Sequence, residues 1–158
     1  MRSKRAKVKV ILPDAKYNSV QVAKLINRAM VDGKKSVAQK QVYNALEIAS
    51  KKSGMKPLEL LDAVLEAVTP QMEVRSRRVG GAAYQIPMPI RGVRGLSLAT
   101  RWLVQESNKR PNKQYHTYAD KLAAEMLDSL EGQSGSVNKK NSSHKMAEAN
   151  KAFSHFRW

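Results

Sequence analysis

Residues 117–132, TYADKLAAEMLDSLEG, contain the most regular apolar repeat of the chain. Apolar side chains recur there every three or four positions, which places them on one face of an amphipathic helix. Thr117 followed by Asp120 is typical of a capping box at a helix start, and Gly132 suits a helix end. The stretch therefore predicts a helix that packs against others through Ala119, Leu122, Ala123, Met126, Leu127 and Leu130.

Three earlier stretches repeat this pattern and predict three more helices. They are residues 19–33, with Gly33 as a left-handed C-cap, residues 36–54, which open on a capping-box sequence at Ser36, and residues 57–70. A fourth helix is predicted between Gly95 and Pro111.

The pattern changes at residues 72–79 and 82–90, which look extended and flank Gly80-Gly81. Two glycines accept positive φ at both positions of a tight turn, so a β-hairpin is predicted. Pro87 and Pro89 cannot donate ladder hydrogen bonds, which should keep the ribbon two-stranded.

Residues 133–143 are polar and predict a loop, and later apolar positions predict a last, basic C-terminal helix, assigned to 138–158. Residues 1–10 form a basic arm. Together these features predict one mainly α domain over 1–158, a bundle of about six helices with a protruding two-stranded β-hairpin and a basic N-terminal arm.

The composition favours a polyanionic partner. The chain has 158 residues, with 29 Lys and Arg against 13 Asp and Glu, a formal net charge of +16. Nucleic acid neutralises such charge and releases counterions. Cysteine is absent, which excludes disulfides, cysteine-ligated metals and thiol nucleophiles, and a small, basic chain without disulfides predicts an intracellular protein. The short apolar runs predict no membrane span, and an anionic membrane surface is the lesser alternative to nucleic acid; we expect no membrane partner.

Catalytic patterns are weak. His116, His144 and His155 have no metal-ligand spacing, and the few acids suggest no paired-carboxylate site. We expect no metal, no cofactor and no catalysis.

The hairpin carries the strongest functional signal. A two-residue turn puts Arg75 and Arg77 on one face with Tyr84, and Arg78 on the other. A ribbon that buries neither face can protrude and bind phosphates through guanidinium groups, with Tyr84 free to stack on a base. Charge that merely protects an edge strand from aggregation would explain one or two arginines, but three within four positions favour nucleic-acid contact.

Four stretches resemble the bacterial-type small-subunit ribosomal protein seven family: DGKKS (32–36), EVRSRRVGG (73–81), YQIP (84–87) and HKMAEANKAF (144–153). The resemblance covers nearly the whole length, with departures at 91–95 and 141–143. It implies binding to the 3′ major domain of small-subunit ribosomal RNA, nucleation of head assembly, and a position beside the exit-site tRNA and the mRNA path. It also implies ribosomal protein eleven as a neighbour and a cytoplasmic or organellar ribosome, and no homo-oligomer is expected.

The resemblance and the basic clusters together nominate two sets of residues. The candidates for ribosomal RNA binding are Arg2, Lys4, Arg5, Lys7, Lys9, Lys34, Lys35, Arg75, Arg77, Arg78, Arg91, Arg94, Arg101, Lys109, Arg110, Lys139 and Lys140. Those expected near tRNA and mRNA are Arg78, Gly80, Gly81, Tyr84, His144, Lys145, Lys151 and Arg157.

Two other functions remain open at this point. An architectural DNA-binding protein could insert the hairpin into a minor groove, with Pro87 or Pro89 as a wedge. An RNA-processing enzyme would need the three histidines to converge in one pocket.

Overall fold

The computed structural model describes residues 10–156. Within them it is mainly helical with one two-stranded hairpin, which confirms the predicted fold class; the predicted arm, apart from Val10, lies outside the described residues. None of the described helices is long and apolar enough to cross a membrane. The elements are α1 (Val20–Ala29), α2 (Lys35–Ser53), α3 (Pro57–Val68), β1 (Met72–Val79), β2 (Ala82–Pro89), α4 (Val93–Lys109), α5 (Tyr118–Leu130), α6 (Gly135–Ala149) and the 3₁₀ helix η1 (Lys151–Phe156).

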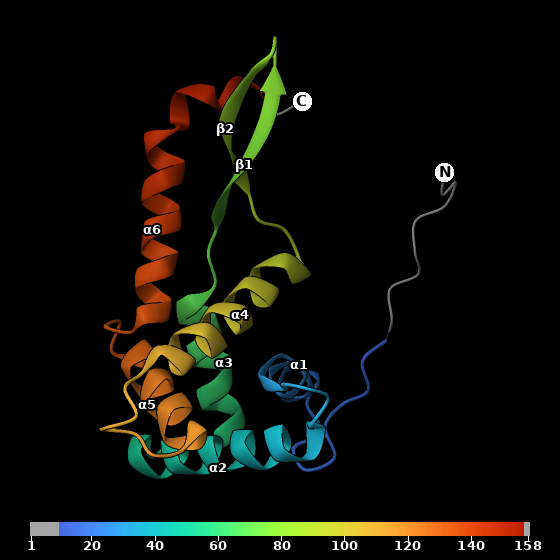
Figure 1. Cartoon of the computed structure of the whole chain (residues 1–158), viewed down its shortest axis with the longest axis vertical. Helices are drawn as coiled ribbons and strands as arrows, with labels where there is room; N and C mark the ends of the chain where they lie inside the picture. Colours follow the sequence, from blue (N-terminus) through green and yellow to red (C-terminus); the bar gives the residue numbers. More distant parts are fainter. Residues whose placement is uncertain (1–9, 157–158) are drawn as a thin grey trace.

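Helices α1 to α5 form the body in the lower half of Figure 1, and α5 contacts α2, α3, α4 and α6. Leu122 and Met126 of α5 are fully buried, as the apolar repeat predicts, whereas Leu127 and Leu130 are only partly buried against the core. Burial of such side chains supplies the main favourable free energy of folding.

Several helix ends follow their sequence signals. The Thr117 hydroxyl accepts a hydrogen bond from the Asp120 amide, and the Asp120 carboxylate accepts one from the Thr117 amide, so the predicted capping box is confirmed. Gly54 closes α2 in the left-handed conformation, at φ 72°, and Pro57 occupies the first position of α3.

Other boundaries were predicted wrongly. Helix α2 begins at Lys35 with Lys34 as its N-cap and no side-chain cap bond, so Ser36 lies inside the helix. Helix α1 ends at Ala29, and Gly33, at φ +72°, turns the connection instead of capping α1. Helix α4 begins at Val93, so Gly95 lies within it instead of preceding it. A Cβ at this position would be 2.9 Å from Thr69 Cγ2, so glycine is what allows the close packing of α4 there.

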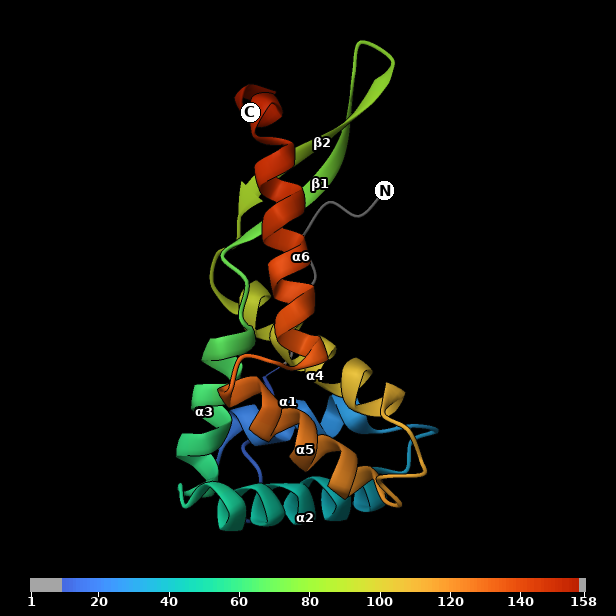
Figure 2. The same cartoon turned by 90° about the vertical axis from the view of Figure 1, so that its left-hand side faces the viewer.

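The hairpin and α6 rise side by side from this body (Figures 1 and 2). Gly80 and Gly81 have φ of +58° and +89°, as a two-residue turn requires. Arg75 pairs with Ile86 and Arg77 with Tyr84 in the antiparallel register, which confirms the predicted faces of the ribbon.

The C-terminal third differs most from expectation. The loop predicted at 133–143 is wrong, since α6 begins at Gly135, where Ser134 caps the helix by accepting a hydrogen bond from the Val137 amide. The chain from 138 to 158 is also not one helix, because α6 ends at Ala149 and η1 follows. The buried face of α6 contains few apolar groups, which explains the missed helix; it consists of Ser136, Val137, Ser143 and Ala147.

Candidate nucleic-acid interface

The tip of the hairpin presents basic side chains to solvent. Arg77 and Arg78 are both exposed at the end of β1, just before the Gly80-Gly81 turn that extends beyond α6 and η1 (Figure 2). Main-chain groups at a glycine turn can approach a ligand closely because no side chain intervenes. This end of the molecule can therefore contact a polyanion with little steric hindrance.

The base of the hairpin is less free than the sequence suggested. Ile86 is fully buried and Pro87 is buried as well, and adjacent strand residues point to opposite faces, so both faces are covered there. The expectation that neither face is buried holds only near the tip.

Tyr84, which was expected to be free for stacking on a base, packs within the protein. Its ring lies 5.2 Å from the ring of Phe153 and 5.5 Å from that of Phe156, both on η1. Tyr84 is consequently half-buried and joins β2 to the C-terminal 3₁₀ helix.

A carboxylate joins two candidate arginines at the hairpin base. Arg75 Nε and Nη2 lie 2.6 and 2.5 Å from Glu73 Oε1, and Arg94 Nε and Nη2 lie 3.1 and 3.0 Å from Glu73 Oε2. Burial alone would raise the pKa of Glu73, but the hydrogen bonds from Arg75 and Arg94 outweigh it and lower the pKa. The group is therefore a carboxylate with two cations, and it keeps one net positive charge.

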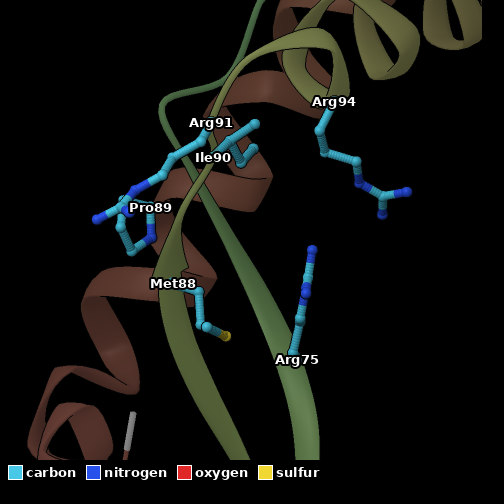
Figure 3. Close-up of a pocket in the computed structure, with 6 residues that line it drawn as sticks. All are labelled: Arg75, Met88, Pro89, Ile90, Arg91 and Arg94. Carbon is cyan, nitrogen blue, oxygen red and sulfur yellow. The ribbon is translucent and has the colours of Figure 1, made fainter. Parts of the chain in front are cut away.

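These two arginines border a surface hollow of about 490 Å³, together with Arg91 and Met88–Ile90. Figure 3 shows Arg75 and Arg94 extending toward one another from β1 and α4, whereas Arg91 extends to the other side, past Pro89. The hollow thus has two converging guanidinium groups. No role was predicted for Glu73. Its position two residues before Arg75 places both side chains on the same face of a strand, and this spacing could have indicated the ion pair.

Arg110 has partners within the protein, so its contribution to a nucleic-acid interface is secondary. Its guanidinium bonds Glu125 Oε2 through Nε and Nη2, at 2.9 and 2.7 Å, and also bonds Asp128. Burial alone would lower the pKa of Arg110, but the hydrogen bonds to Asp128 and Glu125 outweigh this effect, so the pKa is raised above its usual value. The side chain is only 15% exposed, which leaves little of it for a ligand.

Three candidate lysines also have protein partners. Lys109 and Lys139 lie 2.9 and 3.0 Å from Glu106 Oε1, and Lys140 donates to the Ala67 carbonyl at 2.7 Å. Lys139 joins α6 to α4 and Lys140 joins α6 to α3, whereas the Lys109 pair lies within α4. The contribution of these lysines to a nucleic-acid surface is therefore secondary.

The other candidates are dispersed. Lys34 and Lys35 are exposed where α2 begins, at the end of the body away from the hairpin (Figure 1), and Arg101 is half-buried on α4. Lys145 and Lys151 are exposed on α6 and η1 near the hairpin. The remaining candidates, Arg2, Lys4, Arg5, Lys7, Lys9 and Arg157, lie outside the described residues.

The three histidines lie on separate elements. His116 is in the connection between α4 and α5, His144 accepts a hydrogen bond from the Gln71 amide at 3.0 Å, and His155 stacks on Phe156 at the far end of η1. No group of three potential metal ligands forms among residues 10–156. The arrangement offers no pocket in which the histidines could act together.

Comparison with known proteins identifies the family of the chain. The family described as Ribosomal protein S7p/S5e matches residues 1–151. The chain belongs to that family. It is similar to the small ribosomal subunit protein uS7 of Dichelobacter nodosus, at 51% identity over 99% of each chain. It is also 53% identical to the uS7 protein of Caldanaerobacter subterraneus, over 94% of this chain and 93% of that one.

As a member of the S7 family, the chain is a structural, non-enzymatic component of the small ribosomal subunit. The family assignment confirms the recognised resemblance and rejects the RNA-processing enzyme. It also explains a strongly basic protein whose cations face several directions, since a ribosomal protein is surrounded by folded RNA.

Proposed function

We propose that the chain binds the 3′ major domain of small-subunit ribosomal RNA as one RNA-binding domain and nucleates assembly of the subunit head. The observation that carries the proposal is the exposed Arg77-Arg78 pair on a hairpin that projects from the helical body. Arginine forks bind phosphates bidentately, and a projecting ribbon can enter folded RNA where a flat surface cannot.

The proposed contact surface continues from the tip to the hairpin base. It includes Arg75, Arg91 and Arg94 around the hollow, with Lys34, Lys35 and Arg101 as contacts at other sides of the body. We place the terminal arm and Lys109, Lys139 and Lys140 in the same RNA environment as weaker contributors.

The hairpin tip and the C-terminal segment are proposed to lie beside the exit-site tRNA and the mRNA path. Gly80 and Gly81 at the tip, with Arg78, His144, Lys145 and Lys151, support this placement because they lie on elements that meet at one end of the molecule. Ribosomal protein eleven is the proposed protein neighbour, and the compartment is a cytoplasmic or organellar ribosome.

A minor-groove DNA binder is less consistent with the hairpin. Pro87 is buried and Pro89 lies at the end of β2 away from the tip, so neither proline can act as an intercalating wedge. Competition between duplex DNA and the ribosomal RNA fragment would compare the two ligands directly.

Filter binding of the full chain to a transcript of the 3′ major domain tests the proposed function. With about 6–10 phosphate contacts, log affinity should fall against log salt with a slope of roughly −4 to −9, at about 0.7–0.9 per phosphate. An affinity that hardly changes with salt would contradict the proposal.

Replacing Arg77 and Arg78 together with alanine should weaken this binding and make the salt slope shallower by about 1.4–1.8, which corresponds to two lost phosphate contacts. The helical circular dichroism should stay unchanged, because neither side chain is buried. Lys51→Ala with Lys52→Ala is the matched control, since it removes two exposed charges from the end of α2. Equal loss of affinity in both double variants would show that only net charge matters.

A further inference from the structure

Glu73 is an unexpected residue in a surface that binds a polyanion. It is 8% exposed, and it is the acid shared by two arginines that border the hollow at the hairpin base. A carboxylate there repels phosphate and reduces the local charge from +2 to +1. Its presence needs a physical reason that outweighs this repulsion.

The hydrogen-bond pattern supplies that reason. Each arginine uses Nε and Nη2 toward Glu73, so Nη1 of each guanidinium is not engaged by this carboxylate. Arg75 comes from β1 and Arg94 from the start of α4, and Glu73 connects the two elements through both oxygens. The bonds fix the planes of two long side chains, which therefore lose less rotamer entropy when a ligand immobilises them.

We propose that Glu73 is a positioning residue that holds Arg75 and Arg94 so that their remaining N–H donors bind one RNA phosphate in the hollow. The proposal rests on the RNA-binding function proposed above and assigns it a defined phosphate site. Arg91 extends to the other side and is not part of this clamp.

Positioning and simple charge make opposite predictions for Glu73→Gln. The substitution raises the net charge by one, so charge alone predicts tighter binding to any RNA. Loss of a strong acceptor frees both guanidinium groups, so positioning predicts weaker binding to the cognate RNA. The direction of the change separates the two mechanisms.

The experiment measures affinity of full-length variants for the 3′ major-domain transcript and for poly(U) at several salt concentrations. We expect Glu73→Gln to bind the transcript about tenfold or more weakly, from the usual worth of a charge-assisted hydrogen bond, and to bind poly(U) no more weakly than the unchanged protein. Glu59→Gln is the matched control, because Glu59 is an exposed acid paired with Lys56 on α3 and its loss changes charge alone. Glu73→Asp, which keeps the carboxylate, should recover part of the affinity.

A double-mutant cycle tests whether Glu73 acts through Arg94. Arg94→Ala should weaken transcript binding less in the Glu73→Gln background than in the unchanged protein, since the clamp is already lost there. Arg94→Lys keeps the positive charge but lacks the paired Nε and Nη2 donors of a guanidinium group. It should therefore weaken binding nearly as much as Arg94→Ala. The lysine variant also provides the test if Glu73→Gln proves poorly folded by circular dichroism.

Three results would overturn the inference: transcript affinity of Glu73→Gln equal to or tighter than that of Glu59→Gln, additive effects in the cycle, or unchanged binding by Arg94→Lys. The proposed function would fail differently, through salt-independent binding of the unchanged protein or through its failure to bind the transcript. A normal salt slope with an unaffected Glu73→Gln variant would retain the function and reject the clamp.

Discussion

Replacing Arg110 with alanine is expected to lower the free energy of unfolding by about 3–5 kcal/mol, the usual cost of removing one partner of a buried ion pair. Glu125 is 2% exposed, and Arg110 is the cation bonded to it. The same carboxylate accepts hydrogen bonds from the amide and hydroxyl of Ser136, at 2.9 and 2.6 Å. It therefore joins the end of α4, the middle of α5 and the start of α6, and without Arg110 its charge is left without a counterion.

Urea unfolding followed by circular dichroism measures this effect. Lys113→Ala is the control, because Lys113 is exposed in the connection that follows α4, and it should change stability by less than about 0.5 kcal/mol. Adding Glu125→Gln to Arg110→Ala should recover part of the loss, since an amide carries no charge to bury. If Arg110→Ala reduced RNA affinity while leaving stability intact, Arg110 would instead act mainly in RNA binding.

Arg110 also illustrates what charge counting cannot resolve. Its partner Glu125 is 15 positions away, on another helix, so the sequence gives no sign that this arginine is half-buried in an ion pair while Arg77 is exposed. Only the folded arrangement of α4 and α5 distinguishes a structural cation from a phosphate-binding one.

The predictions that succeeded depend on local backbone chemistry. Two consecutive glycines specify the hairpin turn and, with it, the register that places Arg75 and Arg77 on one face. The capping box at Thr117 and the apolar repeat that includes Leu122 specify α5 in the same way, because these sequence patterns lie within the helix that they predict.

The failures have a tertiary cause. Helix α6 buries a face rich in serine and alanine, and Gly135 sits so close to α4 that a Cβ would lie 2.9 Å from Glu106 Oε2. Close approach of helices selects small residues, and small residues leave no apolar repeat to detect. Tyr84 was assigned to a base for a similar reason, since its partner rings lie about 70 residues later in the chain.

The arginines at the tip and at the base of the hairpin occupy two different environments. Near the tip, Arg78 is exposed, and the proposed RNA contact can order it on binding. At the base, Glu73 orders Arg75 and Arg94 before any ligand arrives. Preorganised groups lose less entropy on binding, so the base is expected to fix the orientation of the hairpin on RNA while the tip adapts to it.

The second large effect concerns α5, which packs against α6, the helix that contacts the hairpin. Leu122→Ala should lower the free energy of unfolding by about 2–5 kcal/mol, because it removes a fully buried side chain from the hydrophobic core and leaves a cavity. The midpoint in urea should fall at nearly constant m-value. Leu58→Ala is the control, since Leu58 is 36% exposed on α3 and should cost far less.

RNA binding separates this structural role from a functional one. Helix α5 carries none of the cations in the proposed interface, so Leu122→Ala at a temperature where it remains folded should bind the transcript with unchanged affinity and salt slope. A stability loss below about 1 kcal/mol would contradict a core organised around α5. Weakened binding by a fully folded Leu122→Ala protein would instead mean that packing in the helical body affects the position of the hairpin, because the buried Leu122 side chain cannot contact RNA itself.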